Sequence, residues 1–176
     1  MTKPEQVILC DADVISHFIT ADEVATLPTI FKLPLKMLDQ VYQELLRFPK
    51  KKQYVESLIT DNMIELMPFP DDPVVVKEYL YIKNKRFRGD GESACMAVAR
   101  YNKHILASSN LKDIAEYCKM HKVYYLTTMD FLCRALETKI FDVERCNKFI
   151  TAVLSNNSKL PVKKMEDYKC KTIDFC

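Results

Sequence analysis

The stretch QVILCDAD, residues 6–13, places an unbroken apolar run directly before two aspartates. A short apolar run bounded by polar residues is typical of a strand buried in a parallel sheet. The next residues, DVISHFITA (13–21), carry apolar side chains at positions 14, 15 and 18, which is a helical spacing. The chain therefore opens with a predicted strand, an acidic step and a helix.

The same unit recurs along the chain, because short apolar runs alternate with longer helical patterns. LKML (35–38) fits either a strand or the start of a helix. Strands separated by helices favour βαβ units. We predict an α/β fold, a three-layer sandwich with a central, mostly parallel sheet of about five strands and helices on both faces. The further predicted strands are 63–69, 104–109 and 123–128, and the further helices are 41–48, 50–60, 71–87, 91–103, 111–121, 129–139 and 142–155.

The length of 176 residues suits a single domain, which we place at residues 1–155. Residues 156–176 form a C-terminal extension, and its last 18 residues hold five lysines and three acids. The net charge of +2 means that any nucleic-acid binding must come from local patches. Without an apolar run of about 18 residues, neither a membrane-spanning helix nor a membrane partner is expected.

The seven cysteines form no CxxC pair, so a zinc ribbon is not expected. The apolar run at residues 7–10 is too short for a secretory signal. We therefore predict a cytoplasmic protein whose cysteines are free thiols, since disulfides are rare in that compartment.

Both glycines of the chain lie in FRGDGESACMAVA, residues 87–99. Gly89 and Gly91 enclose Asp90 and directly precede Glu92, at the predicted start of a helix. The segment lacks the Lys-Ser/Thr ending of a phosphate-binding P-loop. We expect the glycines to allow a sharp backbone turn that residues with a Cβ resist. The small residues at 94, 97 and 99 let the helix lie close to its neighbours.

Polar residues follow three of the predicted strands where each strand ends. Because ligands bind outside the carboxyl ends of strands in open α/β sheets, we expect these residues to line one rim. Each could instead cap the next helix, and we favour capping for Thr127, Thr128 and Asp130. For Asp11 we favour a functional role, because Asp13 is better placed to cap. The rim residues are Asp11, Asp13, Ser108, Ser109, Asn110, Asp113, Thr127, Thr128 and Asp130.

Carboxylates gathered on one rim repel each other unless a cation neutralises them. Carboxylate oxygens suit hard ions such as Mg²⁺ or Mn²⁺, which commonly serve phosphodiester hydrolysis. Glu44 borders the apolar stripe of helix 41–48. A glutamate in such a position is ordinarily a solvated residue at the edge of the stripe, which is the alternative to a role at the rim. Glu92 opens helix 91–103, where the helix dipole alone favours an acid.

The order VILCDADVISHF, VYQELL, GDGESACMAVA and ILASSNLKDI resembles the PIN domain, a family of compact α/β metal-dependent nucleases. The resemblance covers about residues 6–135 and places the four family acids at Asp11, Glu44, Glu92 and Asp113. Asn110 stands at a position that the family often fills with aspartate, which favours weak or absent catalysis as an alternative. The auxiliary residues that the resemblance implies are Asp13, Asp90, Ser108, Asn110 and Asp130.

The resemblance implies a ribonuclease that uses Mg²⁺ or Mn²⁺, with RNA preferred to single-stranded DNA as substrate. It also implies a toxin-like component with an antitoxin protein as partner, and a homodimer. The alternatives are an inactive PIN-like nucleic-acid-binding or scaffold protein and a hydrolase of a small phosphorylated substrate. Basic residues directly before the acidic turn are expected to bind the phosphate backbone, whereas the run at 50–52 is expected to be a solvated face. The predicted phosphate-binding residues are Lys83, Lys85, Arg86 and Arg88.

Overall fold

The computed structural model describes residues 5–86 and 89–174, without the side chain of Arg86. Its five strands form one sheet in the order β3-β2-β1-β4-β5, and every pair is parallel. The predicted α/β sandwich is thus confirmed, and LKML proves to be a strand. The strands are β1 (Ile8–Cys10), β2 (Leu35–Leu38), β3 (Glu65–Met67), β4 (Ile105–Ala107) and β5 (Tyr125–Leu126).

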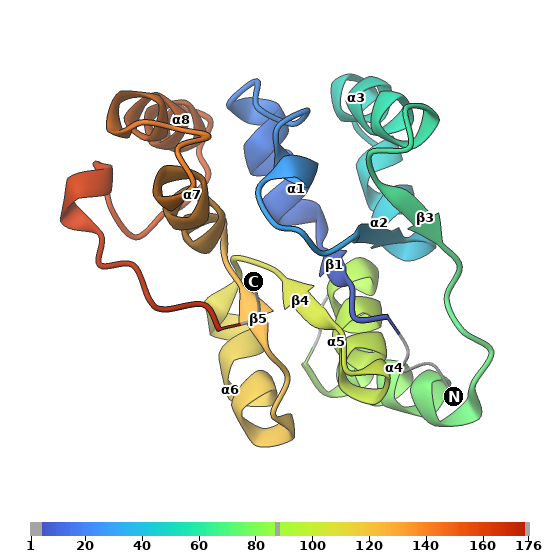
Figure 1. Cartoon of the computed structure of the whole chain (residues 1–176). Helices are drawn as coiled ribbons and strands as arrows, with labels where there is room; N and C mark the ends of the chain where they lie inside the picture. The colour runs from blue at the N-terminus through green and yellow to red at the C-terminus, as the bar shows by residue number, and fades with distance from the viewer. Residues whose placement is uncertain (1–4, 87–88, 175–176) are drawn as a thin grey trace.

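Helices cover both faces of the sheet, with α1, α3, α7 and α8 on one side and α4, α5 and α6 on the other (Figure 1). Among the described residues, no helix combines the length and apolar character needed to cross a membrane. The helices are α1 (Ala12–Thr20), α2 (Asp39–Leu46), α3 (Pro49–Thr60), α4 (Pro73–Arg86), α5 (Asp90–Asn102), α6 (Leu111–His121), α7 (Thr128–Glu137) and α8 (Val143–Ser155), with short 3₁₀ turns at Leu27–Thr29 and Met165–Asp167.

On the face of the sheet covered by α4, α5 and α6, the central helix is α5, which contacts β1, β2 and β4. All residues from Gly91 to Ala99 are buried, as the alanine-rich sequence predicts. Small side chains keep the helix axis close to the sheet, so polar residues in its first turn are held near the ends of the strands.

The C-terminal strap, residues 156–174, packs against α7 and α8 rather than standing apart from the domain. Met165 is buried, and its N–H donates to Asn147 Oδ1 on α8 at 2.7 Å. Cys170 forms a disulfide with Cys133 on α7, so the prediction of free thiols throughout is wrong for these two residues. Cys10, Cys95, Cys118 and Cys146 are free and buried.

Lys171 anchors the strap at the start of α7. Its ammonium lies 3.0 Å from Asp130 Oδ2, donates to the Tyr125 carbonyl at 3.2 Å and lies over the Tyr125 ring. The Asp130 side chain is only 2% exposed. Lys171 therefore neutralises a buried carboxylate beside the outer strand of the sheet.

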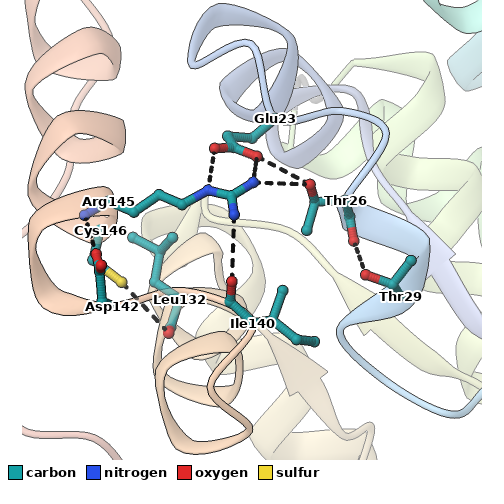
Figure 2. Close-up of polar contacts among 8 residues, drawn as sticks. All are labelled: Glu23, Thr26, Thr29, Leu132, Ile140, Asp142, Arg145 and Cys146. Atoms are coloured by element: carbon teal, nitrogen blue, oxygen red, sulfur yellow. Dashed lines mark hydrogen bonds and ion pairs between the residues drawn. The ribbon is translucent and has the colours of Figure 1, made fainter.

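A second link between distant segments joins α8 to the chain that follows α1 (Figure 2). Arg145 Nε and Nη2 donate to the two oxygens of Glu23, both at 2.6 Å. Thr26 Oγ1 donates to the same carboxylate at 3.0 Å, and the guanidinium lies 4.3 Å from the Phe141 ring centroid. The planar fork of arginine matches this bidentate geometry, which lysine does not reproduce.

We expect Arg145→Lys to lower the free energy of unfolding by about 0.5–1 kcal/mol at pH 7, since the pair is partly exposed. The Arg145 hydrogen bonds lower the pKa of Glu23. A lowered folded-state pKa gives stability above the unfolded pKa that disappears as pH falls through the folded value. Denaturant unfolding at pH 7 and pH 3 should therefore show a smaller difference between variant and wild type at pH 3.

Candidate functional site

The candidate site lies where the strand order reverses, at the carboxyl end of β1. This strand pairs with β2 on one side and with β4 on the other. Crevices at such a reversal are the usual ligand sites of open α/β sheets. Asp11 directly follows β1, and its N–H donates to the Ala107 carbonyl at the end of β4 at 2.9 Å. The first predicted acid is therefore fixed at the centre of the predicted rim.

Asp11 is buried and surrounded by other carboxyl groups. Burial raises its pKa well above the usual range, and the charges of Asp13, Glu92 and Glu44 raise it further, in that order. Its Oδ1 accepts the Ala12 N–H at 2.8 Å, and the residue is the N-cap of α1. The expectation that Asp13 would be the cap is therefore wrong, and Asp11 combines the capping position with a place in the acid cluster. We call Asp11, Asp13, Glu44 and Glu92 the acid cluster.

Asp13 joins α1 to the end of β4. Its Oδ2 accepts the N–H of Ser109 at 2.7 Å and the hydroxyl of Ser108 at 3.5 Å. Burial raises the pKa of Asp13, and these hydrogen bonds oppose the effect. Ser108, predicted as an auxiliary residue, is fully buried against the cluster.

Glu44 lies against the two glycines and not at a solvated edge. Its Oε1 accepts the N–H of Gly91 at 2.9 Å. Gly89 has φ −58° and ψ 156°, and neither glycine has a positive φ, so the expectation of a backbone conformation that residues with a Cβ resist is wrong. The glycines serve close packing: a Cβ at Gly91 would lie 2.9 Å from Val41 Cγ2 and 3.0 Å from Glu44 Oε2, and one at Gly89 would lie 3.1 Å from Glu44 Oε1.

Gly91→Ala is therefore expected to destabilise the fold more than Gly89→Ala does. The Cβ at position 91 meets a side chain of the α2 core, whereas the Cβ at position 89 meets the end of a longer side chain. Overpacking of this kind costs about 1–3 kcal/mol. Denaturant unfolding of both variants measures the difference, and equal stability of the two would contradict the packing explanation.

Glu92 is buried in the first turn of α5, and its charge raises the pKa of Asp11. The thiols of Cys10 and Cys95 lie near the acid cluster, and both are fully buried. Burial and the nearby Asp11 charge raise the pKa of both thiols. They stay protonated at neutral pH, so the reactive groups at this site are carboxylates and not thiolates.

Two further predicted residues, Asp113 and Asn110, bond to each other. Asn110 Nδ2 donates to Asp113 Oδ2 at 2.6 Å on the exposed start of α6. The carboxylate of Asp113 is thus engaged at the start of α6, whereas the charges that raise the pKa of Asp11 include those of Asp13, Glu92 and Glu44. Asp130 instead completes the capping box of α7 with Thr127, which confirms capping for these two residues, whereas Thr128 is the first residue of the helix and does not cap it.

Of the predicted basic residues, Lys83 and Lys85 lie on α4, and they differ in their contacts. Lys83 pairs with Asp90, which also accepts the Tyr79 hydroxyl at 3.3 Å. Lys83 lowers the pKa of Asp90 and occupies its carboxylate. Lys85 is exposed, with its ammonium 5.7 Å from the Tyr81 ring centroid. The side chain of Arg86 and the whole of Arg88 lie outside the described residues.

A polar chain that the sequence did not predict leads from the acid cluster into the α1–α7 interface. Ser109 Oγ lies 2.7 Å from Thr128 Oγ1 and accepts the Thr128 N–H at 2.8 Å. Thr128 Oγ1 lies 2.8 Å from His17 Nδ1, and Ser109 donates its N–H to Asp13. Ser109 stands in the predicted rim, but no spacing in the sequence indicates His17 as its neighbour.

The donor set of the acid cluster has the chemistry that a hard divalent cation requires. Asp11 is desolvated, and three other carboxyl groups act on its charge, which a bound cation would relieve. Over residues 5–86 and 89–174, however, no three His, Cys, Asp or Glu side chains are already arranged as a set of ligands. A bound cation would therefore have to draw the carboxylates into a ligand arrangement that they do not have without it.

Comparison with known protein families and with curated proteins finds no match for this chain. The resemblance to the PIN domain stays a prediction, which rests on the order of the four sequence segments.

Proposed function

We propose that the chain is a Mg²⁺- or Mn²⁺-dependent ribonuclease of PIN type that hydrolyses phosphodiester bonds. The observation that carries this proposal is the position of Asp11. It is buried at the reversal of strand order, with the charges of three other carboxyl groups acting on it. Such a concentration of acid at a ligand-binding edge is costly to the fold and suits a cation site.

Asp11, Glu44 and Glu92 would hold the ion, with Asp13 or Asp113 as a fourth carboxylate. The ion supplies a water of lowered pKa and positive charge beside the scissile phosphate. Asp13 is oriented by the Ser109 N–H, and Glu44 by the Gly91 N–H. Both orienting donors are backbone groups, so the fold itself sets the directions of these two carboxylates.

The test is cleavage of a mixed RNA pool by the purified chain in Mn²⁺, in Mg²⁺ and in EDTA. We expect cleavage in either metal, none in EDTA, and none from Glu92→Gln. A Mn²⁺ titration should show weaker affinity in the variant. Cleavage by Glu92→Gln at the wild-type rate would overturn the assignment.

The Asn110–Asp113 hydrogen bond favours a second candidate, an inactive PIN-like nucleic-acid-binding or scaffold protein. It engages the carboxylate that the resemblance assigns as fourth acid and leaves it on the exposed start of α6. RNA binding without metal-dependent cleavage would select this candidate.

The location and partners form part of the proposal. We propose a cytoplasmic location on the four free thiols, and the Cys133–Cys170 disulfide is the observation against it. An antitoxin partner and a homodimer are proposed from the resemblance alone.

A further inference from the structure

The corner between α2 and α3 presents an exposed aromatic ring one helical turn beyond Glu44. Phe48 is 54% exposed, whereas most large apolar side chains of the chain are buried. Its N–H donates to the Leu45 carbonyl at 3.1 Å, and its carbonyl accepts the Lys52 N–H at 2.9 Å. Pro49 follows at the first position of α3. The backbone on both sides of the ring is therefore fixed, four residues after Glu44 in the sequence.

Lys51 is the member of the 50–52 run that turns inward. Its ammonium lies 4.5 Å from the Phe48 ring centroid. Burial and, after it, the Lys51 charge lower the pKa of His17 to about 4. Within the described residues Lys51 has no ion pair, whereas Lys52 pairs with Glu56. The expectation of a uniformly solvated run is thus wrong at position 51.

Arg47 adds a second cation to the corner. It is exposed, and its charge contributes to lowering the pKa of Asp90 at the start of α5. The corner thus carries an exposed arginine directly before Phe48 and a lysine whose ammonium contacts the ring. Cations interleaved with an exposed aromatic ring are the elements that bind single strands without sequence preference.

We propose that Arg47, Phe48 and Lys51 bind a single-stranded segment of nucleic acid, with one base stacked on Phe48 and the adjoining phosphates held by Arg47 and Lys51. This proposal rests on the proposed function and adds that the substrate is single-stranded where it binds. Bases in a duplex are already stacked on each other and cannot cover the ring, so the site discriminates against paired strands. An acidic peptide would satisfy the cations but has no planar base for the ring.

The test measures binding without metal, so that cleavage does not interfere. Fluorescence anisotropy of a labelled oligouridylate of about 12 nucleotides in EDTA gives the dissociation constant. We expect Phe48→Ala to weaken binding about tenfold and Phe48→Trp to retain it. Lys51→Ala should weaken binding and reduce the slope of log K against log salt by about 0.7. Lys52→Ala is the matched control from the same run and should change neither.

Thermal unfolding checks that the variants are folded, which the exposure of Phe48 favours. Unchanged binding by Phe48→Ala would overturn the site. An equal loss of affinity in this variant for a blunt duplex would also overturn it, and so would full displacement of the oligouridylate by polyglutamate. Failure of metal-dependent cleavage with the binding pattern intact would overturn the nuclease but keep the site. Normal metal-dependent cleavage together with a Phe48→Ala variant that binds like wild type would keep the nuclease and overturn the site.

Discussion

Asp11→Asn is expected to abolish metal-dependent cleavage and to raise the melting temperature of the metal-free protein. Asparagine caps a helix as well as aspartate does, so the hydrogen bond to the Ala12 N–H is retained. The substitution removes a buried charge on which three other carboxyl groups act. Substitution of a residue that only orients a metal ligand lowers activity about 10–100-fold, so loss of a ligand itself should lower it more than about 100-fold.

The gain in stability should depend on pH. The folded-state pKa of Asp11 lies well above its unfolded value, so the folded state binds a proton more tightly. Stability is then lost as pH rises from the unfolded pKa of about 3.9 towards the folded value, and it is not lost in the variant. Asp11→Asn should therefore melt a few degrees further above wild type at pH 7.5 than at pH 4, where about 1 kcal/mol corresponds to roughly 2–4 °C.

Added Mn²⁺ should act on the melting temperatures in the opposite direction, because a ligand of the folded state stabilises that state by mass action. Mn²⁺ should raise the melting temperature of wild type and leave Asp11→Asn unchanged. A variant that melts below wild type in EDTA at pH 7.5, or one that Mn²⁺ stabilises equally, would contradict a repulsive cation site at Asp11.

The sequence predicts the sheet and the position of Asp11 because both are local signals. A run of four apolar residues followed by an acid determines which strand end carries the carboxylate. The role of the glycines was not predictable, since it depends on the Glu44 side chain of another helix lying against residues 89 and 91. Composition indicates only that glycine is rare, not which neighbour excludes a Cβ.

The polar chain and the strap illustrate the same limit. His17 and Thr128 meet because α1 and α7 pack together, although they are 111 residues apart. Cys133 and Cys170 are separated by 37 residues without a motif between them. Long-range pairs of this kind follow from tertiary packing, which single-sequence patterns do not specify.

Reduction of the Cys133–Cys170 disulfide is expected to produce the largest loss of stability available to this chain without touching its core. The bond closes a loop of 37 residues, for which the chain-entropy relation gives about 4 kcal/mol. Measured values fall at or below that figure, so we expect a loss of about 2–4 kcal/mol and a fall in melting temperature of roughly 5–15 °C. Cys170 is exposed, so Cys170→Ser creates no buried polar group and should reproduce the effect of reduction.

Lys171→Met separates the covalent bond from the ion pair that lies beside it. It removes the cation from Asp130 while the disulfide remains, and the half-exposed position of Lys171 limits the expected loss to about 1 kcal/mol. Thermal unfolding of wild type, Cys170→Ser and Lys171→Met, each with and without dithiothreitol, gives the comparison. Dithiothreitol should lower the melting temperature of wild type and Lys171→Met but not that of Cys170→Ser. A wild-type melting temperature that is insensitive to the reductant would mean that the strap is held by its noncovalent contacts, at Met165 and Lys171, and not by the disulfide.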